Sequence, residues 1–198
     1  MSSTALVPSL VRPSNRVAAL TADAVLVALG VTLIAASAQF SFHLPHTPVP
    51  VTGQTFAVLL VGGAYGATRG FATMAAYLVV GGLGFGVFAQ HSSGWDYLRL
   101  SSVTGGYLVG MLVAATLVGW LADRGWDRNA LRSLPTMVLG NIVIYACGYF
   151  WLQHALGLTA GQTWYAGVRP FLPGDALKIV LAAGLLPVAW KVVDEVRR

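Results

Sequence analysis

Residues 170–190 read PFLPGDALKIVLAAGLLPVAW and set the character of the whole chain. No charged residue occurs from Ile179 to Trp190, so this segment predicts a helix buried in a membrane. Two opposite charges, Asp175 and Lys178, precede it, and at three residues apart they share one helix face. One interpretation is local: the carboxylate complements the helix dipole and the lysine reaches the lipid–water interface. We favour the other, in which the pair is kept at membrane depth because a solute binds to it.

The overall composition is that of an integral membrane protein. Of the 198 residues 56% are hydrophobic and only 10% are charged, whereas a soluble domain carries about 25% charged residues. The formal net charge is +5, but the basic residues lie at the ends of apolar runs. That placement is typical of membrane topology and not of a nucleic-acid-binding surface. The one cysteine lies inside an apolar run and indicates neither a disulfide nor a zinc site.

Six apolar runs predict an all-α bundle that crosses the membrane six times as a single domain over residues 1–198. Residues 1–16 are interpreted as a short polar tail on the cytoplasmic side. The second run is shorter than the others, and a tight turn at Thr68–Gly70, which includes Arg69, is expected directly after it. The expected spans are about 17–42, 54–67, 71–89, 103–122, 134–156 and 171–193.

The distribution of lysine and arginine predicts the orientation. Six spans put both termini on one side, and positive charges concentrate on the cytoplasmic side of membrane proteins. Cytoplasmic termini leave only Arg99 and Arg169 in outer loops, with Lys178 at the outer mouth of its helix. A binding site is then expected to open outward. The nine basic residues placed inside are Arg12, Arg16, Arg69, Arg124, Arg128, Arg132, Lys191, Arg197 and Arg198.

The sequence lacks the motifs of several chemistries. There is no GxxxxGK[ST] phosphate loop, so the chain itself is not expected to hydrolyse ATP. It has no HExxH motif, no carboxylate cluster for magnesium and no nucleophile signature, so no catalytic residue and no cofactor are expected. His43 and His46 are spaced like metal ligands but have no third ligand nearby, so no metal site is expected. Inverted half-repeats, the mark of many secondary transporters, are not evident.

Other residues are candidates for contacts with a ligand or a partner. Trp95, in the outer connection, belongs either to an interfacial aromatic belt or to a wall over a ligand. Asn141 is either a helix–helix hydrogen-bonding residue or a ligand contact. Small residues four apart on the first helix permit close helix approach, within the bundle or to another membrane subunit. These pairs are Ala18/Ala22 and Ala24/Ala28.

A set of motifs, taken in order, resembles the BioY family. The resemblance covers about Ala18 to Lys191. The chain departs from the family pattern at Gly84–Phe88, at Ser102–Val103 and in the Gln90–Ser102 connection, so the resemblance assigns no ligand contact there. The matching motifs are Pro48–Thr55 (PVPVTGQT), Gly63–Gly66 with Gly70, Tyr77 with Gly81–Ala89, Thr104–Tyr107 (TGGY) with Gly110, and Pro170–Lys178 (PFLPGDALK).

BioY proteins are the biotin-binding S components of energy-coupling factor (ECF) transporters. The resemblance therefore implies a six-helix bundle in a bacterial or archaeal cell membrane, with an outward-facing biotin pocket. It implies an energising module made of a transmembrane T subunit and two ABC-type ATPases, which alone use ATP. The alanine-rich first helix would dock on the T subunit. Asp175 and Lys178 would be binding residues, with Gln54 and Tyr107 in the motifs around the pocket.

Biotin also suits the physical interpretation of these residues. Its carboxylate can pair with Lys178 near a helix N-terminus, where the dipole and the cation act together. Its ureido group needs both donors and acceptors, which Asp175, Gln54, Thr104 or Ser93 can supply. Its apolar rings would lie against aliphatic and aromatic walls, as ligands do in most small-molecule pockets.

Alternatives from other classes stay open at this point. They are an S component for another vitamin or for nickel or cobalt, and a stand-alone secondary carrier of a small organic anion. An intramembrane enzyme with Asp175 as its base is disfavoured by the missing metal and nucleophile motifs. The sequence does not decide which end of biotin meets Asp175 or Lys178, and it leaves a homo-oligomer open.

Overall fold

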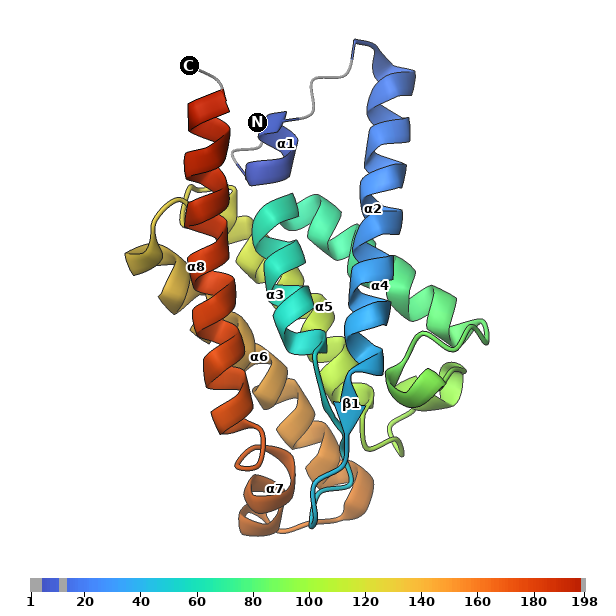
Figure 1. The fold of residues 1–198 in the computed structure, drawn as a ribbon. Coiled ribbons are helices and arrows are strands. Elements are labelled where there is room, and N and C mark those ends of the chain that lie inside the picture. Colours follow the sequence, from blue (N-terminus) through green and yellow to red (C-terminus); the bar gives the residue numbers. More distant parts are fainter. Residues whose placement is uncertain (1–4, 11–13, 197–198) are drawn as a thin grey trace.

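The structure, a computed structural model, describes residues 5–10 and 14–196 and is built almost entirely of helices. The long helices form one bundle, with α1 and the C-terminal end of α8 at one end and the β1–β2 hairpin and α7 at the other (Figure 1). The helices are α1 (Leu6–Leu10), α2 (Arg16–Gln39), α3 (Gln54–Tyr65), α4 (Ala67–Gly82), α5 (Gly105–Ala122), α6 (Ala130–Leu156), α7 (Ala160–Gly167) and α8 (Leu172–Val196). The short elements are β1 (Ser41–Phe42), β2 (Val51–Thr52) and the 3-10 turns η1 (Ala89–His91) and η2 (Trp95–Leu98).

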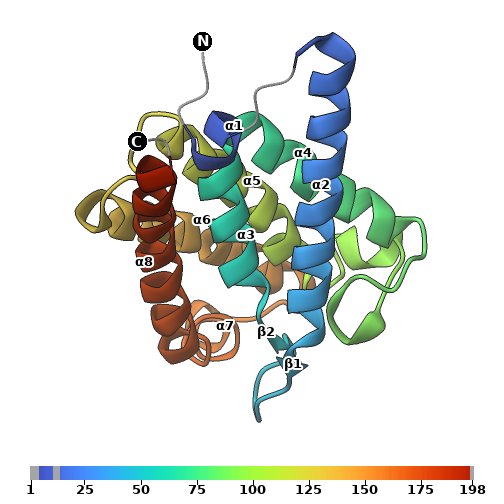
Figure 2. The same ribbon diagram turned by 45° about the horizontal axis from the view of Figure 1, so that its top comes forward.

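Helices α2, α5, α6 and α8 are long and apolar enough to cross a membrane. Helix α3 is apolar but has only 12 residues, and α4 has 16. Helix α5 lies in the middle of the bundle, with α3, α4 and α6 around it (Figure 2), and its buried face is rich in glycine and alanine. Small side chains there let the neighbouring helices approach closely, which is how helices pack in lipid.

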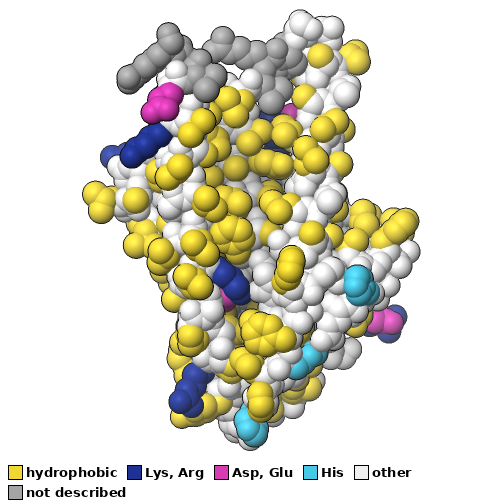
Figure 3. Space-filling view, viewed as in Figure 1, with side chains coloured by type: hydrophobic (Ala, Val, Ile, Leu, Met, Phe, Trp, Pro, Cys, Tyr) yellow, Lys and Arg dark blue, Asp and Glu magenta, His cyan; other side chains and the backbone are white. Residues whose placement is uncertain are grey.

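Hydrophobic side chains cover much of the outer surface formed by α2, α3 and α8 (Figure 3). Val25, Leu29 and Leu33 of α2 and Val180 and Val188 of α8 are all exposed. Exposed apolar surface of this extent suits a protein surrounded by acyl chains, because a water-soluble protein rarely exposes large contiguous apolar patches.

The break between α3 and α4 lies at Gly66, not at residues 68–70 where the sequence suggested a turn. Gly66 has φ +81°, a backbone conformation that side-chain-bearing residues rarely adopt. The first amide of α4, Ala67 N, then donates to Asp123 Oδ2 over 3.0 Å, so a residue at the end of α5 caps α4. Arg69, which suggested a loop, is helical and pairs over 2.7 Å with Asp23 of α2.

Other element boundaries also differ from the expectation. The third run ends as a helix at Gly82 and not at residue 89, because Gly84, with φ +106°, leads into the irregular connection. The connection 157–169 contains helix α7, which begins with a reciprocal capping box between Thr159 and Gln162. Residues 6–10 of the expected tail form α1, whose Leu6 packs against Trp190 and Val193 of α8.

The β1–β2 hairpin carries the proline-rich connection to the start of α3. Its strands pair antiparallel, with Ser41 opposite Thr52 and Phe42 opposite Val51. Gly53 N then donates to the carbonyl oxygens of Ser37 and Phe40, which holds the end of the hairpin against the end of α2. These bonds fix the position of Gln54 and Thr55, the first two residues of α3, next to the N-terminal end of α8.

Candidate functional site

A cavity of about 240 Å³ lies at the hairpin end of the bundle. Its walls come from the hairpin, the connection that contains η1 and η2, and the facing ends of α3, α5, α6 and α8. Most of the wall is apolar, and Asp175 and Lys178 lie together on one side of it. The apolar side chains include Val49, Phe88, Val103, Leu108, Met111, Ile144 and Phe171, and the polar ones include His43, Gln54, Thr55, Gln90, Ser92, Thr104, Tyr107 and Tyr145.

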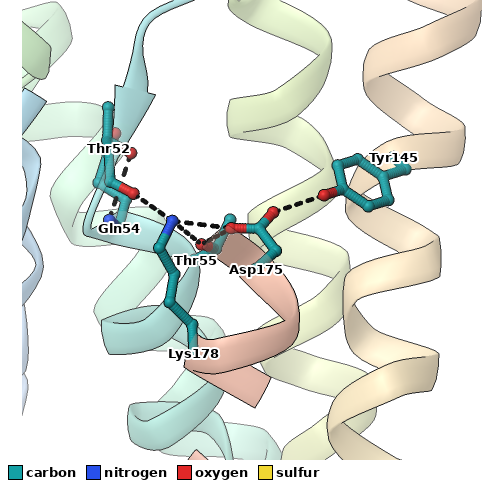
Figure 4. A network of polar contacts seen from close by, with 6 residues as sticks. All are labelled: Thr52, Gln54, Thr55, Tyr145, Asp175 and Lys178. Carbon is teal, nitrogen blue, oxygen red and sulfur yellow. Dashed lines mark hydrogen bonds and ion pairs between the residues drawn. The ribbon is translucent and has the colours of Figure 1, made fainter. Parts of the chain in front are cut away.

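Asp175 and Lys178 form an ion pair at the start of α8, with 2.7 Å between Lys178 Nζ and Asp175 Oδ1 (Figure 4). Pro173 occupies the first turn of the helix, where a missing amide hydrogen costs nothing. The three-residue spacing then points both side chains toward α3. Asp175 is 3% exposed, whereas the side chain of Lys178 is part-buried, and both residues line the cavity.

The carboxylate of Asp175 is held by three donors from three helices. Oδ1 accepts from Lys178 Nζ and, over 3.1 Å, from Thr55 Oγ1 of α3. Oδ2 accepts from the hydroxyl of Tyr145 on α6 over 2.6 Å. A buried charge costs several kcal/mol unless it is paired and hydrogen-bonded, and this one is both.

Lys178 is also fully hydrogen-bonded. Its ammonium group donates to the carbonyl oxygen of Thr52 over 2.6 Å, to Asp175 Oδ1 over 2.7 Å and to Thr55 Oγ1 over 3.2 Å. Three donors therefore meet three acceptors. The lysine turns toward α3 and the hairpin. It does not extend toward the lipid–water interface, as it would if it served only to reach the membrane surface. Together the two side chains present a neutral donor–acceptor surface.

A second polar chain runs from Gln54. Its Nε2 donates over 2.7 Å to the hydroxyl of Tyr77, which donates over 2.9 Å to the carbonyl oxygen of Val87. Tyr77 is fully buried, so this chain fixes the direction of the Gln54 amide in the cavity wall. Within the described part of the chain, the amide oxygen of Gln54 accepts no hydrogen bond, so it is available as an acceptor.

Tyr107 and Thr104 line the cavity from the start of α5. The Tyr107 hydroxyl donates over 2.7 Å to the carbonyl oxygen of Gly167 in α7, and its ring lies 6.3 Å from that of Phe171 between centroids. The Thr104 hydroxyl is 3.2 Å from that of Ser102. Tyr107 thus joins α5 to α7 and offers its ring as a wall, while Thr104 offers a hydroxyl.

Three residues singled out from the sequence lie outside the cavity lining: Ser93, Trp95 and Asn141. Ser92, next to Ser93, lines the cavity instead. The half-exposed Trp95 packs over Gly82 of α4, away from the cavity. Asn141 lies one helical turn before Tyr145 in α6 and is farther than Tyr145 from the opening of the cavity. Its buried Oδ1 has no hydrogen-bond partner among the described residues.

Thr55, Tyr145 and the carbonyl oxygen of Thr52 also belong to the site, although they were not among the residues predicted from the sequence. Thr55 follows Gln54 within the PVPVTGQT motif, which was the available signal. Tyr145 is four residues from Asn141 and so shares its helix face. Thr52 contributes only through its backbone, and no side-chain pattern marks such a contact.

The alanine pairs of the first helix divide between two environments. In α2, Ala18 and Ala22 are half-buried, whereas Ala24 and Ala28 are exposed. The buried side of α2 is formed by Gly30, Ile34 and Ala38. The Ala24/Ala28 pair therefore offers more surface to a second molecule than the Ala18/Ala22 pair does.

The two histidines of the hairpin connection lie in different places. His43 lines the cavity, and its Nδ1 is 2.9 Å from Gln90 Nε2. His46 lines a separate groove together with Arg169 and Pro173. Among the described residues, no group of three or more His, Cys, Asp or Glu side chains is placed to hold a metal ion.

Comparison with known proteins shows which family the sequence matches. A family model described as "BioY family" matches residues 9–195. A probable biotin transporter BioY of Rickettsia prowazekii is 33% identical over 162 residues, which is 80% of this chain and 78% of that one. A probable biotin transporter BioY of Pyrococcus horikoshii is 35% identical over 157 residues, 79% of this chain and 89% of that one. The biotin transporter BioY of Rhizobium etli is 32% identical over 171 residues, 82% and 90% of the two chains.

A solved structure has the same fold. It is the crystal structure of the S-component for biotin from an ECF-type ABC transporter, with a TM-score of 0.76 and 22% sequence identity. The match covers 91% of this chain and 95% of that one. The bundle described above is therefore an S-component fold.

Proposed function

Because the chain belongs to the BioY family, we propose that it is a biotin-binding membrane protein that mediates uptake of the vitamin. The observation that carries this proposal is the paired Asp175 and Lys178 in the wall of a small, mostly apolar cavity. An apolar cavity with a few converging polar groups is the usual form of a small-molecule site. The chain acts in this proposal as a transport component and not as an enzyme.

The hydrogen bonds of the pair favour one orientation of the ligand. All three ammonium hydrogens of Lys178 already have acceptors, whereas Asp175 Oδ2 accepts, among the residues that the structure describes, only from Tyr145. A carboxylate oxygen can accept two hydrogen bonds, so one position at Oδ2 is left for a ligand N–H. The ureido group of biotin supplies N–H donors and a carbonyl, and it is neutral, like the pair itself.

We therefore place the ureido ring at Asp175 and Lys178 and the carboxylate toward the outer opening of the cavity. The ureido oxygen would take the place of Thr55 on Lys178, because that 3.2 Å contact is the longest of the three. Gln54 and Thr104 offer further polar contacts. The carboxylate end then lies near His43, Gln90 and Ser92, the polar residues of the hairpin and the η1 connection.

The orientation in the membrane follows from charge and from the placement of the site. The cavity lies at the same end as Arg99 and Arg169. The opposite end holds α1, the α5–α6 connection with Arg124 and Arg128, and the first turn of α6 with Arg132. The positive-inside rule supports a six-helix topology with cytoplasmic termini and a cavity that opens outward. The six membrane helices in this proposal are α2, α3, α4, α5, α6 and α8.

Uptake against a gradient needs an energy source that this chain lacks. We propose that it works with a transmembrane T subunit and two ABC-type ATPases and contacts the T subunit through α2. The exposed face of α2 around Ala24 and Ala28 supports this assignment, since small residues let a second membrane helix approach closely.

The direct test is equilibrium binding of labelled biotin to the purified protein, in competition with other vitamins, Ni²⁺ and Co²⁺. Biotin is expected to bind at one site per chain and to be displaced by none of the others at equal concentration. Tighter binding of another vitamin or of a metal ion would overturn the assignment. Uptake into liposomes by the purified chain without ATP would indicate a stand-alone carrier.

A further inference from the structure

The connection between α5 and α6, together with the first turn of α6, presents three arginines to the surface. Arg124, Arg128 and Arg132 are all exposed. Among residues 5–10 and 14–196, none of them pairs with a carboxylate; the ion pairs found there join Arg69 to Asp23, Arg99 to Asp96 and Lys178 to Asp175. Arg124 donates one hydrogen bond, over 2.9 Å, to the carbonyl oxygen of Trp120. The remaining donors of Arg124 and the guanidinium groups of Arg128 and Arg132 are available for an external anion.

The acidic residues of the same segment are used internally. Asp127 is 2% exposed, and its Oδ2 accepts from the indole Nε1 of Trp190 in α8 over 2.5 Å. Asp123 is half-buried and caps α4 through Ala67 N. In sequence the arginines and aspartates alternate and nearly cancel, but the fold turns one acid inward, engages the other with α4, and leaves the bases outside.

Two of the guanidinium groups rest on tryptophan rings. Arg124 lies 3.4 Å from the centre of the half-exposed Trp120 ring, and Arg128 lies 4.5 Å from that of Trp190. Stacking restricts both side chains, so less conformational entropy remains to be lost when they bind. Tryptophan is also the residue that membrane proteins place at the lipid–water interface.

Large apolar side chains surround the arginines. Leu131 in the first turn of α6 is 88% exposed, and Trp126 and Leu134 are exposed as well. Exposure of these apolar side chains to water is unfavourable, whereas the neighbouring arginines need a polar surrounding. The combination fits the depth in a bilayer where acyl chains end and phosphates begin.

We propose that this segment, Trp120 to Leu134, binds the headgroup of an anionic phospholipid. The phosphate would accept paired hydrogen bonds from the planar guanidinium groups, which match its oxygens. The acyl chains would lie along Leu131 and Leu134. The exposed leucines continue the apolar surface of the membrane helices. This favours a lipid over a protein partner, which would not need that continuity, and over free phosphate, which has no apolar part to contact them.

The test compares lipid retention by the purified protein and its variants. Native mass spectrometry in detergent, after addition of phosphatidylglycerol or phosphatidylcholine, is expected to show phosphatidylglycerol retained by the wild type. The double variant Arg124→Gln/Arg132→Gln keeps Arg128 on Trp190, so it should fold, and it is expected to retain phosphatidylglycerol at least tenfold less well. Arg99→Gln/Arg169→Gln, at the other end of the bundle, is the charge-matched control and should behave as wild type.

Three results would overturn the proposal. One is equal retention of phosphatidylglycerol by the wild type and by Arg124→Gln/Arg132→Gln. Another is an equal loss in the control variant, which would indicate a net-charge effect. The third is displacement of the lipid by inorganic phosphate at an equal concentration, which would mean that the lipid chains contribute nothing. If the double variant does not fold, Arg132→Gln alone replaces it, because Arg132 stacks on neither of these tryptophan rings.

Discussion

The hydroxyl of Tyr145 donates a 2.6 Å hydrogen bond to Oδ2 of Asp175 and so joins α6 to the start of α8 inside the cavity. The other oxygen of the same carboxylate is held by Lys178 and Thr55. The carboxylate therefore cannot rotate without breaking bonds to two other helices. A ligand N–H that approaches Oδ2 meets an acceptor that is already oriented, so little ordering is required on binding.

Removal of this one hydroxyl should weaken ligand binding without unfolding the protein. Tyr145→Phe deletes a hydrogen bond to a charged acceptor, which contributes about 1.5–3 kcal/mol to the free energy of unfolding. The Kd for biotin is expected to rise as well, because Asp175 Oδ2 is no longer held in one orientation before the ligand binds. Isothermal titration calorimetry on the purified variants measures this change. Tyr149→Phe is the matched control, because its hydroxyl donates to the Ala160 carbonyl oxygen at the surface. Equal losses in the two variants would refute a specific role for Tyr145.

The contribution of the Asp175–Lys178 ion pair to stability can be measured separately from its contribution to biotin binding. Asp175→Asn leaves the Lys178 ammonium buried without its counter-charge, and one-sided removal of a buried pair typically costs about 3–5 kcal/mol of unfolding free energy. The double variant Asp175→Asn/Lys178→Met removes both charges and should recover most of that loss, because uncharged replacements of buried pairs are often neutral. Thermal unfolding in detergent measures both.

Biotin binding to the same double variant decides between the two roles of the pair. If the pair serves the ligand, the variant regains stability but not affinity. Recovery of wild-type affinity together with stability would mean that the pair is structural only.

Close packing around Tyr107 gives a third prediction. An added Cβ at Gly148 of α6 would lie against the Tyr107 ring, whose hydroxyl bonds to Gly167. Gly148→Ala should therefore cost about 1–3 kcal/mol of stability through overpacking and also weaken biotin binding. Gly184→Ala in α8 is the control: a Cβ there meets no atom within 4 Å, so it should be neutral or stabilise by up to about 1 kcal/mol. A Gly148→Ala protein as stable as the control would contradict the geometry described here.

The buried carboxyl of Asp127 predicts a pH dependence of stability. Burial raises the pKa of Asp127 above its ordinary value, although the hydrogen bond from Trp190 and the charge of Arg128 offset part of this. The folded protein then binds the proton more tightly than the unfolded chain does. This residue's contribution to stability is complete below the ordinary aspartate pKa of about 4 and is lost as the pH rises through the folded pKa.

Asp127→Asn removes that titration while an amide oxygen still accepts from Trp190. The difference in Tm between the variant and the wild type is therefore expected to grow in favour of the variant as the pH is raised from 4 to 8. The exposed Asp194→Asn serves as the surface-charge control, with a difference that stays constant. A Tm difference for Asp127→Asn that is also independent of pH would show that Asp127 ionises in the folded protein as it does in the unfolded chain.

Local relationships could be predicted from the sequence, and relationships between helices could not. The spacing of Asp175 and Lys178 fixes their common face in any helix, so their pairing was predictable. Thr55 and Tyr145 reach the same carboxylate from 120 and 30 residues away. Those contacts depend on how α3 and α6 pack against α8, which periodicity does not determine.

The errors in helix boundaries have the same origin. Arg69 resembled a loop residue because a charge in an apolar run usually marks its end, but Asp23 on another helix neutralises it. Gly66 interrupts the helix at the point where Asp123 is positioned to cap the next helix, α4. Trp95 resembled a wall over the ligand, yet Gly82 offers it a flat surface on α4. In each case a partner distant in sequence decides the outcome.

Equilibrium binding of biotin to the purified wild type and to Lys178→Ala is the most direct test of the account. Lys178 connects the hairpin, α3 and Asp175 through its three hydrogen bonds, so its truncation leaves Asp175 uncompensated. We predict saturable binding at one site in the wild type. Loss of the hydrogen bond from the charged Lys178 to the ligand removes about 1.5–3 kcal/mol, so the Kd of the variant is expected to be roughly 10–100-fold higher. Equal affinity in the two proteins, or no binding of biotin by the wild type, would contradict the account.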